Sequence, residues 1–184
     1  EVDRSSAIRV VTNASVTIGQ NMNVSGTMST RIVSGVASER QITNCTVTIA
    51  AGGTPQRPLG IGSRDIGGAP VGLVSGVAGA LGANNMGQLV RYVGRVTAKI
   101  ASSIWVDDGW GVLDPVGYTG LLVRCTTSSP LVAVGDMVIV TGIIEGSVSS
   151  GESANRRQIK MRDYSELIVL TSLTSGTSGQ SARL

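Results

Sequence analysis

Alternating apolar and polar positions predict a series of β-strands in the second half of the chain. Runs rich in Val, Ile and Thr are bounded there by Gly, Pro, Asp and Ser, which is the pattern of strands separated by turns. We expect five strands and a short sixth piece, at 88–98, 102–106, 120–126, 136–144, 156–163 and 166–170. The segment 107–111, Asp-Asp-Gly-Trp-Gly, is typical of a turn between the second and third strands.

The first part of the chain repeats the pattern of the second. Residues 16–26 match residues 132–142 at a constant spacing of 116, and residues 39–42 match residues 156–159 at a spacing of 117. Further upstream, residues 7–10 resemble residues 120–123. Self-similarity at a fixed spacing indicates two copies of one β-unit.

The segment between the copies, 52–87, contains 11 Gly and 3 Pro and has no sustained period, so it predicts a connector. Its apolar part, 69–83, has two interpretations: a buried segment that crosses against a barrel, or a helix with a face of small residues. The pattern favours the buried segment, because glycine is a poor helix former. The tail, 171–184, is rich in Ser, Thr and Gly and predicts a flexible end. We therefore expect domains at 1–51 and 88–170, with the connector 52–87 between them and the tail behind.

Composition supports an all-β chain. Val, Ile and Thr make up 54 of the 184 residues, and these β-branched side chains favour pleated strands over helices. No apolar run reaches the roughly 18 residues that a membrane-spanning helix needs, so we expect no membrane insertion.

The second copy resembles an OB-fold, the five-stranded Greek-key barrel. The resemblance rests on the glycine-bent first strand, the Asp107-Asp108-Gly109 turn and the late Val140-Thr141-Gly142 strand. Residues 3–10, 39–42 and 58–68 extend it to the tandem OB-fold modules of exported, mostly uncharacterised bacterial surface proteins. The resemblance implies two OB-fold-like barrels joined by a Gly/Pro-rich connector.

In this alignment the first copy lacks the first two strands of its barrel. Such a gap exposes unpaired strand edges, which proteins avoid. A removed upstream segment, the connector or a strand from another chain would fill it, and strand addition is a recurrent way of building fibres. The tail, or the segment just before it, can reach a neighbouring copy. The candidate assembly residues are Asp3, Ile8, Val10 and Leu173.

An OB-fold often binds oligosaccharide or single-stranded nucleic acid on its second and third strands, where aromatic rings stack on the ligand. The alternative is that the rings are core and turn packing. The candidate ligand-binding residues are Trp105, Trp110, Tyr118, Arg91, Arg95 and Arg124.

The sequence offers few residues for catalysis or metal binding. The chain has no His, which removes the usual general base and the commonest metal ligand. Asp107, Asp108 and Asp114 lack the spacing of a helix-flanked calcium loop and are typical of a solvated turn. We expect no enzyme activity, no cofactor and no metal site, and we expect Cys45 and Cys125 to be buried and unpaired.

Charge and hydropathy favour self-association. Charged residues are 15% of the chain and the mean hydropathy is +0.23, so a monomer would expose much apolar surface, which commonly marks an interface. The net charge of +3 is too small to indicate a nucleic-acid partner. We therefore expect an extracellular or cell-surface structural protein that polymerises with itself, with an OB-fold module for carbohydrate or single-stranded nucleic acid as the alternative.

Overall fold

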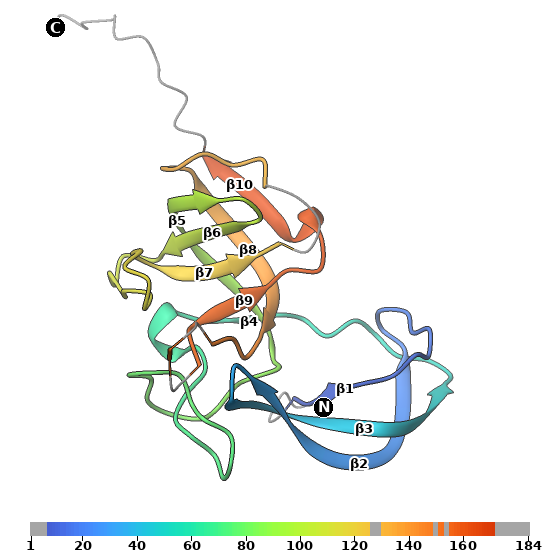
Figure 1. Ribbon diagram of the computed structural model, residues 1–184. Helices are drawn as coiled ribbons and strands as arrows, with labels where there is room; N and C mark the ends of the chain where they lie inside the picture. The colour runs from blue at the N-terminus through green and yellow to red at the C-terminus, as the bar shows by residue number, and fades with distance from the viewer. Residues whose placement is uncertain (1–6, 126–129, 149–150, 153–154, 172–184) are drawn as a thin grey trace, which may run out of the picture.

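The computed structural model describes residues 7–125, 130–148, 151–152 and 155–171, and its architecture is nearly all β (Figure 1). The strands of these residues form two sheets, one of three strands and one of seven. The larger sheet makes the upper body in Figure 1 and the smaller one lies below it, to the right. The expectation of an all-β chain is confirmed.

The larger sheet curls into a closed barrel of five strands. In order of pairing around the ring, they are β5 (Leu89–Ile100), β6 (Ser103–Asp107), β7 (Leu121–Arg124), β9 (Gln158–Lys160) and β8 (Met137–Ile144). The ring closes because β8 also pairs with β5. Two strands extend the sheet outside the ring, β4 (Leu59–Gly60) beside β5 and β10 (Leu167–Thr171) beside β8.

Alternation along the strands fills the barrel with apolar side chains. On β5, Val90, Tyr92 and Val96 are buried, whereas Arg91 and Arg95 between them are exposed. A side chain of this size stabilises the fold by about 1.5–3 kcal/mol when it is fully buried. The buried alternate positions of all five strands join one apolar cluster.

The barrel strands coincide with the five strands expected from the sequence, but two of them are shorter. The third begins after Gly120, whose φ of 103° interrupts the extended backbone. The fifth begins only at Gln158, because the main chain of Arg156 bonds to Ser147 instead of a neighbouring strand. After Lys160 the chain leaves the sheet and forms the 3-10 turn η2 (Tyr164–Glu166) before β10.

The glycine-rich segment between the copies packs against the barrel. It contains the 3-10 turn η1 (Ser63–Asp65). Four of its apolar residues belong to the same cluster as the barrel interior, namely Ile66, Val77, Ala80 and Met86. A side chain at Gly68, where φ is 62°, would collide with the main chain of Ala83. Burial is partial, since Leu73 and Leu81 are exposed.

The smaller sheet is open. It consists of β1 (Arg9–Val10), β2 (Asn21–Val33) and β3 (Val36–Ala50) in the order β1-β3-β2. β1 runs parallel to β3 and β2 runs antiparallel to it. Among the described residues, no strand pairs with the outer edge of β1 or of β2.

The two sheets share one pairing register at the positions that the sequence repeat aligns. The parallel pairs of the barrel are Leu122 with Gln158 and Val123 with Ile159, and those of the open sheet are Arg9 with Gln41 and Val10 with Ile42. The antiparallel pairs of the barrel are Ile143 with Lys160 and Ile144 with Ile159, and those of the open sheet are Thr27 with Thr43 and Met28 with Ile42. β1, β3 and β2 therefore correspond to β7, β9 and β8.

Gly26 and Gly142 show the same correspondence at atomic detail. A Cβ atom at Gly142 would lie 2.6 Å from both Cγ2 of Ile159 and the main-chain oxygen of Lys160. At Gly26 it would lie 2.7 Å from Cγ2 of Ile42 and 2.8 Å from the oxygen of Thr43. Only glycine fits this close approach of two strands, so the repeat preserves a packing requirement.

The long strand β3 combines the roles of β9 and β10. Val47, Thr48 and Ile49 lie opposite Val24, Asn23 and Met22 of β2, as Leu167, Ile168 and Val169 of β10 lie opposite Val140, Ile139 and Val138 of β8. In the barrel, η2 lies between β9 and β10. At the equivalent position β3 has a bulge, where the φ of Asn44 is 48°. The open sheet thus matches every barrel strand except β5 and β6.

Candidate functional site

The proposed ligand-binding aromatic residues are split between buried and exposed positions. Trp105 is 5% exposed, and its ring centroid lies 4.3 Å from that of Tyr118. Because Tyr118 comes from the turn between β6 and β7, this turn folds over the outer face of β6. Trp105 and Tyr118 therefore pack on each other, which matches the packing alternative.

Trp110 is exposed and has a different neighbour. The guanidinium carbon of Arg64 lies 4.0 Å from the centre of its ring, an arrangement with cation–π attraction. Arg64 belongs to η1, so this contact joins the connector to the turn after β6. The ring retains exposed surface.

The three candidate arginines lie on the outside of the barrel without forming one patch with the rings. Arg91 donates to the hydroxyl of Thr141 at 3.4 Å, and Arg95 donates to the carbonyl of Gly135 at 2.7 Å. Arg124 ends β7 and is exposed. Arg91 also lines the cavity between the barrel and the open sheet, and the rings of Trp105, Trp110 and Tyr118 do not line that cavity.

The carboxylates of the predicted turn are used in local structure. Asp108 accepts hydrogen bonds from the main-chain nitrogen and the hydroxyl of Ser63, each at 2.8 Å. Asp114 is buried and forms an ion pair with Arg156. Within the described residues, no group of three His, Cys, Asp or Glu side chains is arranged to hold a metal ion.

The open sheet has one apolar and one polar face. Residues directly opposite each other in an antiparallel pair point to the same face. On one face lie the apolar pairs Met22 with Ile49, Val24 with Val47 and Met28 with Ile42, followed at the end by the polar pair Thr30 with Arg40. On the other face lie the polar pairs Asn23 with Thr48, Ser25 with Thr46, Thr27 with Thr43, Ser29 with Gln41 and Arg31 with Glu39. The apolar face corresponds to the interior of the barrel.

This apolar face remains substantially exposed. Met22 is 40% exposed and Met28 is 51% exposed, whereas their counterparts in the barrel, Val138 and Ile144, are fully buried. Ile8, one of the candidate assembly residues, is 40% exposed as well, and Val10 is half-buried. Among the described residues, no strand covers this apolar face of the open sheet.

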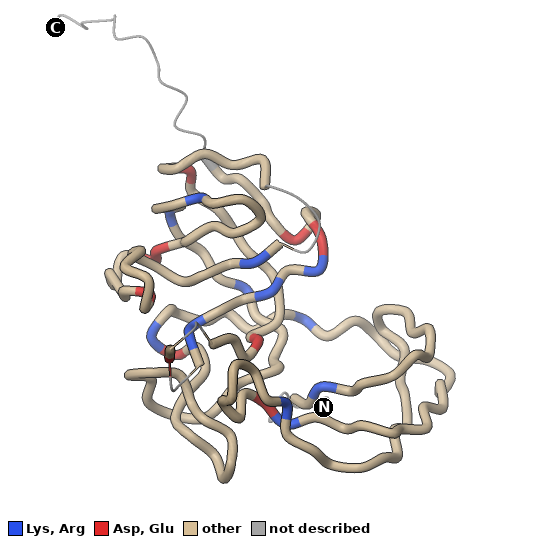
Figure 2. The backbone as a smooth tube through the Cα atoms, viewed as in Figure 1, with Lys and Arg blue, Asp and Glu red and all other residues tan. Residues whose placement is uncertain are grey.

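Along most of its length, from Asn21 to Thr30, the outer edge of β2 has neither charged residues nor Pro, although the strand has bulges after Ser25 and Arg31. Natural sheets protect their edges with charged side chains, especially Lys, and with Pro. From Val10 to Thr30 the chain has no charged residue and no Pro. Figure 2 shows the same distribution, with the far part of the open sheet free of acidic and basic residues.

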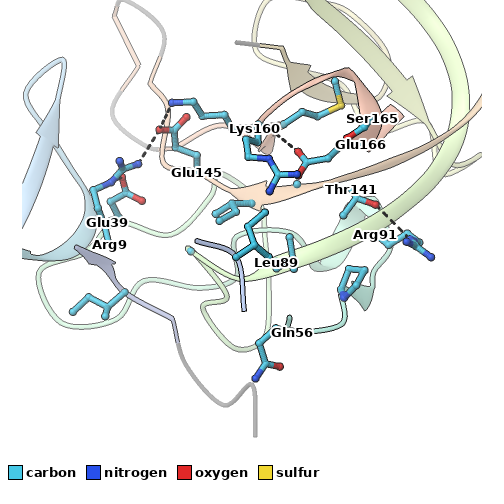
Figure 3. Close-up of a pocket in the computed structure, with 18 of the residues that line it drawn as sticks. Arg9, Glu39, Gln56, Leu89, Arg91, Thr141, Glu145, Lys160, Ser165 and Glu166 are labelled. Carbon is cyan, nitrogen blue, oxygen red and sulfur yellow. Dashed lines mark hydrogen bonds and ion pairs between the residues drawn. The ribbon is translucent and has the colours of Figure 1, made fainter. Parts of the chain in front are cut away.

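A cavity of about 750 Å³ separates the open sheet from the barrel. On the sheet side it is lined by Ile8, Arg9, Val10 and Ile18, and on the barrel side by Leu89 and Ile143 among others (Figure 3). Ile8, Arg9 and Val10 are consecutive, and consecutive strand residues point to opposite faces. The cavity therefore lies along the edge of β1 and gives access to its unpaired main-chain groups.

A cluster of charges holds the open sheet to the barrel at one end of this cavity. Glu39 of β3 accepts from Arg9 and from Arg31, each at 2.7 Å. Arg9 also donates to Glu145 at 2.8 Å, and Lys160 lies 3.4 Å from the same carboxylate. Partial burial lowers the pKa of Arg9, but attraction and hydrogen bonds to Glu39 and Glu145 outweigh it, so the pKa is raised overall.

Two parts of this site are not predicted from the sequence. Of the candidate assembly residues, Ile8 and Val10 line the cavity, Asp3 and Leu173 lie outside the described residues, and the role in assembly stays a prediction. The charge cluster is not visible in the sequence because its members are far apart along the chain, with 136 positions between Arg9 and Glu145. The open edge of β2 is not predicted either, although the uncharged run from Val10 to Thr30 is visible in the sequence.

Within the described residues, no helix is long and apolar enough to cross a membrane. Comparison of the chain with known protein families, with curated proteins and with solved structures finds no match.

Proposed function

We propose that this chain is a non-catalytic structural subunit that associates with further copies of itself by strand addition at the open sheet. The observation that carries the proposal is the outer edge of β2, which is uncharged from Asn21 to Thr30, unpaired among the described strands and bordered by an exposed apolar face. An exposed, long, hydrophobic edge strand is a template for pairing with another chain.

The proposal includes an assignment of both sheets to OB-fold-like barrels. The first, second, third, fifth and fourth strands of the closed ring pair in that order, from β5 through β6, β7 and β9 to β8. The shared register supports the assignment of the open sheet to the same fold without its first two strands. Strands supplied from outside would then take the places of β5 and β6.

Donation between copies would produce a polymer. A contact between two different surfaces of identical subunits does not close on itself unless the rotation between them does, so it generates an open filament. We place the filament outside the cell or on its surface, because the abundance of Gly, Ser and Thr and the scarcity of Lys suit exported surface proteins.

The alternative, an OB-fold module that binds oligosaccharide or single-stranded nucleic acid, has weaker support. Ligand stacking needs an accessible ring face, and Trp105 is covered by Tyr118. Trp110 is the exposed tryptophan, but it lies in a turn next to Arg64. Binding of a labelled oligonucleotide or oligosaccharide that Trp110→Ala abolishes, without loss of folding, would favour this alternative.

The proposal is tested by placing a charge on the edge of β2. Ser25→Lys adds a cation to the polar face of this edge strand, so it leaves the apolar face intact. Gln41→Lys is the matched control, since Gln41 lies on the same face but is paired on both sides, with Arg9 and with Ser29. We expect assemblies of the unchanged chain in sedimentation and negative-stain imaging, with loss of assembly in Ser25→Lys and retention in Gln41→Lys. A chain that stays monomeric at all concentrations contradicts the proposal, as does equal assembly by both variants.

A further inference from the structure

We infer that the strand that adds to β2 is β10 of a second copy, paired edge to edge with it. This inference rests on the proposed self-association and names the partner segment. The two strands would join the open sheet of one copy to the seven-stranded sheet of the next.

β10 has the properties of a donor edge. It pairs with β8 on one side and stands at the end of the strand order of its sheet, so its other side is open among the described strands. Residues 167–171 carry no charge and no Pro, so this edge lacks two common protections against pairing, although it has a bulge between Val169 and Thr171. Ile168 is 49% exposed and Leu170 is 51% exposed. These apolar side chains would be covered in the assembly.

The acceptor edge cannot be reached by β10 of the same chain. In the strand order β1-β3-β2, β1 lines the cavity shared with the barrel, and β2 lies two strands away from β1. Near the end of β2, Arg31 does reach the barrel and donates to the main-chain oxygen of Gly146 at 3.1 Å. None of the residues of β2 lines that cavity. β10 runs along the barrel away from the open sheet (Figure 1), so its partner must be another molecule.

The correspondence of β2 with β8 predicts the direction of the added strand. In the barrel, β8 carries β5 antiparallel on the edge that corresponds to the open edge of β2, with Tyr92 opposite Val140 and Arg91 opposite Thr141. The equivalent positions of β2 are Val24 and Ser25. A strand of the second copy would therefore run antiparallel to β2 and place every second side chain over the apolar face.

Because the donor and acceptor edges are different surfaces, the contact is head-to-tail. Each subunit would use β2 to accept one neighbour and β10 to extend another. In this arrangement the edges of β2 and β10 are paired in every subunit inside the filament and are unpaired only at its two ends. It also differs from an isologous dimer, in which β2 of one copy would pair with β2 of its partner.

Disulfide trapping tests the pairing directly. Cysteines are placed on β2 as Asn21→Cys, Asn23→Cys or Ser25→Cys, and on β10 as Val169→Cys, each in a separate chain that also carries Cys45→Ser and Cys125→Ala. Directly paired strand residues have Cα atoms about 4.5–5.5 Å apart, which a disulfide can span. We expect a linked heterodimer for at least one β2 position mixed with Val169→Cys. Gln41→Cys, on a strand paired on both sides, is the control and should not link.

Three outcomes overturn the inference while the proposed self-association survives. The first is preferential linking of β2 to β2, which shows an isologous contact. The second is assembly that Ser25→Lys abolishes but Leu170→Lys leaves unchanged. The third is loss of assembly on removal of residues 172–184 from a chain whose barrel still unfolds cooperatively, because the tail would then be the donor. Absence of any assembly by the unchanged chain instead contradicts the proposed function itself.

Discussion

Ser38 and Asn155 occupy the same position in the two repeats, and their side chains hydrogen-bond to each other across 117 residues of sequence. Both residues are fully buried. The amide nitrogen of Asn155 also donates to the main-chain oxygens of Ser38 at 3.0 Å and of Ser75 at 2.9 Å. A single side chain thus connects β3 of the open sheet, the glycine-rich connector and the segment that leads into β9.

Asn155→Ala should loosen this junction. The substitution leaves the carbonyls of Ser38 and Ser75 without their amide donor, and a buried unsatisfied polar group costs about 1–3 kcal/mol. We expect a loss of about 2–4 kcal/mol in the free energy of unfolding, measured by denaturant titration. Asn13→Ala, at an exposed position, is the control and should change stability little. Equal stability of the two variants would contradict a stabilising contribution of the hydrogen bonds that Asn155 makes.

The strands and the repeat could be predicted from sequence because they depend on local alternation. The five strands of the barrel follow period-two patterns, and the residues aligned at spacings of 116 and 117 do share one register. Gly26 and Gly142 are visible in the same alignment as a shared glycine, although only the structure shows which strand each one approaches.

The burial of Trp105 could not be predicted in the same way. Its strand neighbours Ile104 and Val106 point into the barrel, so alternation places Trp105 outside. It is buried because the turn after β6 returns and lays Tyr118 on it, and no local pattern encodes the path of that turn. Cys45 was misjudged for a related reason. The sequence predicts that it is buried, but no described strand covers the apolar face of its sheet and Cys45 is only half-buried.

Gly142→Ala should destabilise the barrel more than any exposed glycine substitution. The added methyl group would overlap Ile159 and the main chain of Lys160, and overpacking of this kind costs about 1–3 kcal/mol. Gly26→Ala creates the same overlap with Ile42 but should cost less, because Ile42 is half-buried in an open sheet. Gly60→Ala, where nothing lies within 4 Å, is the control. Thermal unfolding of the three variants gives the order, and an equal effect at Gly60 and Gly142 contradicts it.

Glu39→Gln should weaken the attachment of the open sheet to the barrel. It removes the charge that Arg9 and Arg31 share and leaves both near a single carboxylate, Glu145. The guanidinium groups are about one-third exposed, so solvent screens part of the effect and we expect a loss of about 1–2 kcal/mol. Arg162→Gln, in an exposed ion pair, should change stability little because solvent screens the pair. Chemical denaturation at low and high salt measures both, and a salt-independent loss in Glu39→Gln contradicts the electrostatic origin.

Trp105→Ala should unfold or strongly destabilise the chain, whereas Trp110→Ala should not. Truncation of a buried aromatic side chain costs about 3–5 kcal/mol, and Trp105 packs between β6 and Tyr118. Trp110 is exposed and loses mainly the contact with Arg64. Thermal unfolding followed by circular dichroism compares the two. Similar stabilities of the two variants would contradict the burial of the Trp105 ring and would favour Trp105, Trp110 and Tyr118 as a ligand-binding surface.

Cys125 should remain unreactive at neutral pH and should make stability fall in alkaline solution. Burial raises the pKa of its thiol to about 11, so the folded chain holds this proton after the unfolded chain has released it. Stability from this group is therefore complete below pH 9 and decreases as the pH rises toward 11, by about 2 kcal/mol at pH 11. Cys45, whose sulfur lies 3.2 Å from the carbonyl of Val11 and is only half-buried, should react first with a thiol reagent. The measurement is the difference between the unchanged chain and Cys125→Ala in the pH dependence of unfolding, since every other titrating group contributes equally to both. Identical pH profiles, or labelling of Cys125 as fast as Cys45 in the folded chain, would show that the thiol is not held in the core.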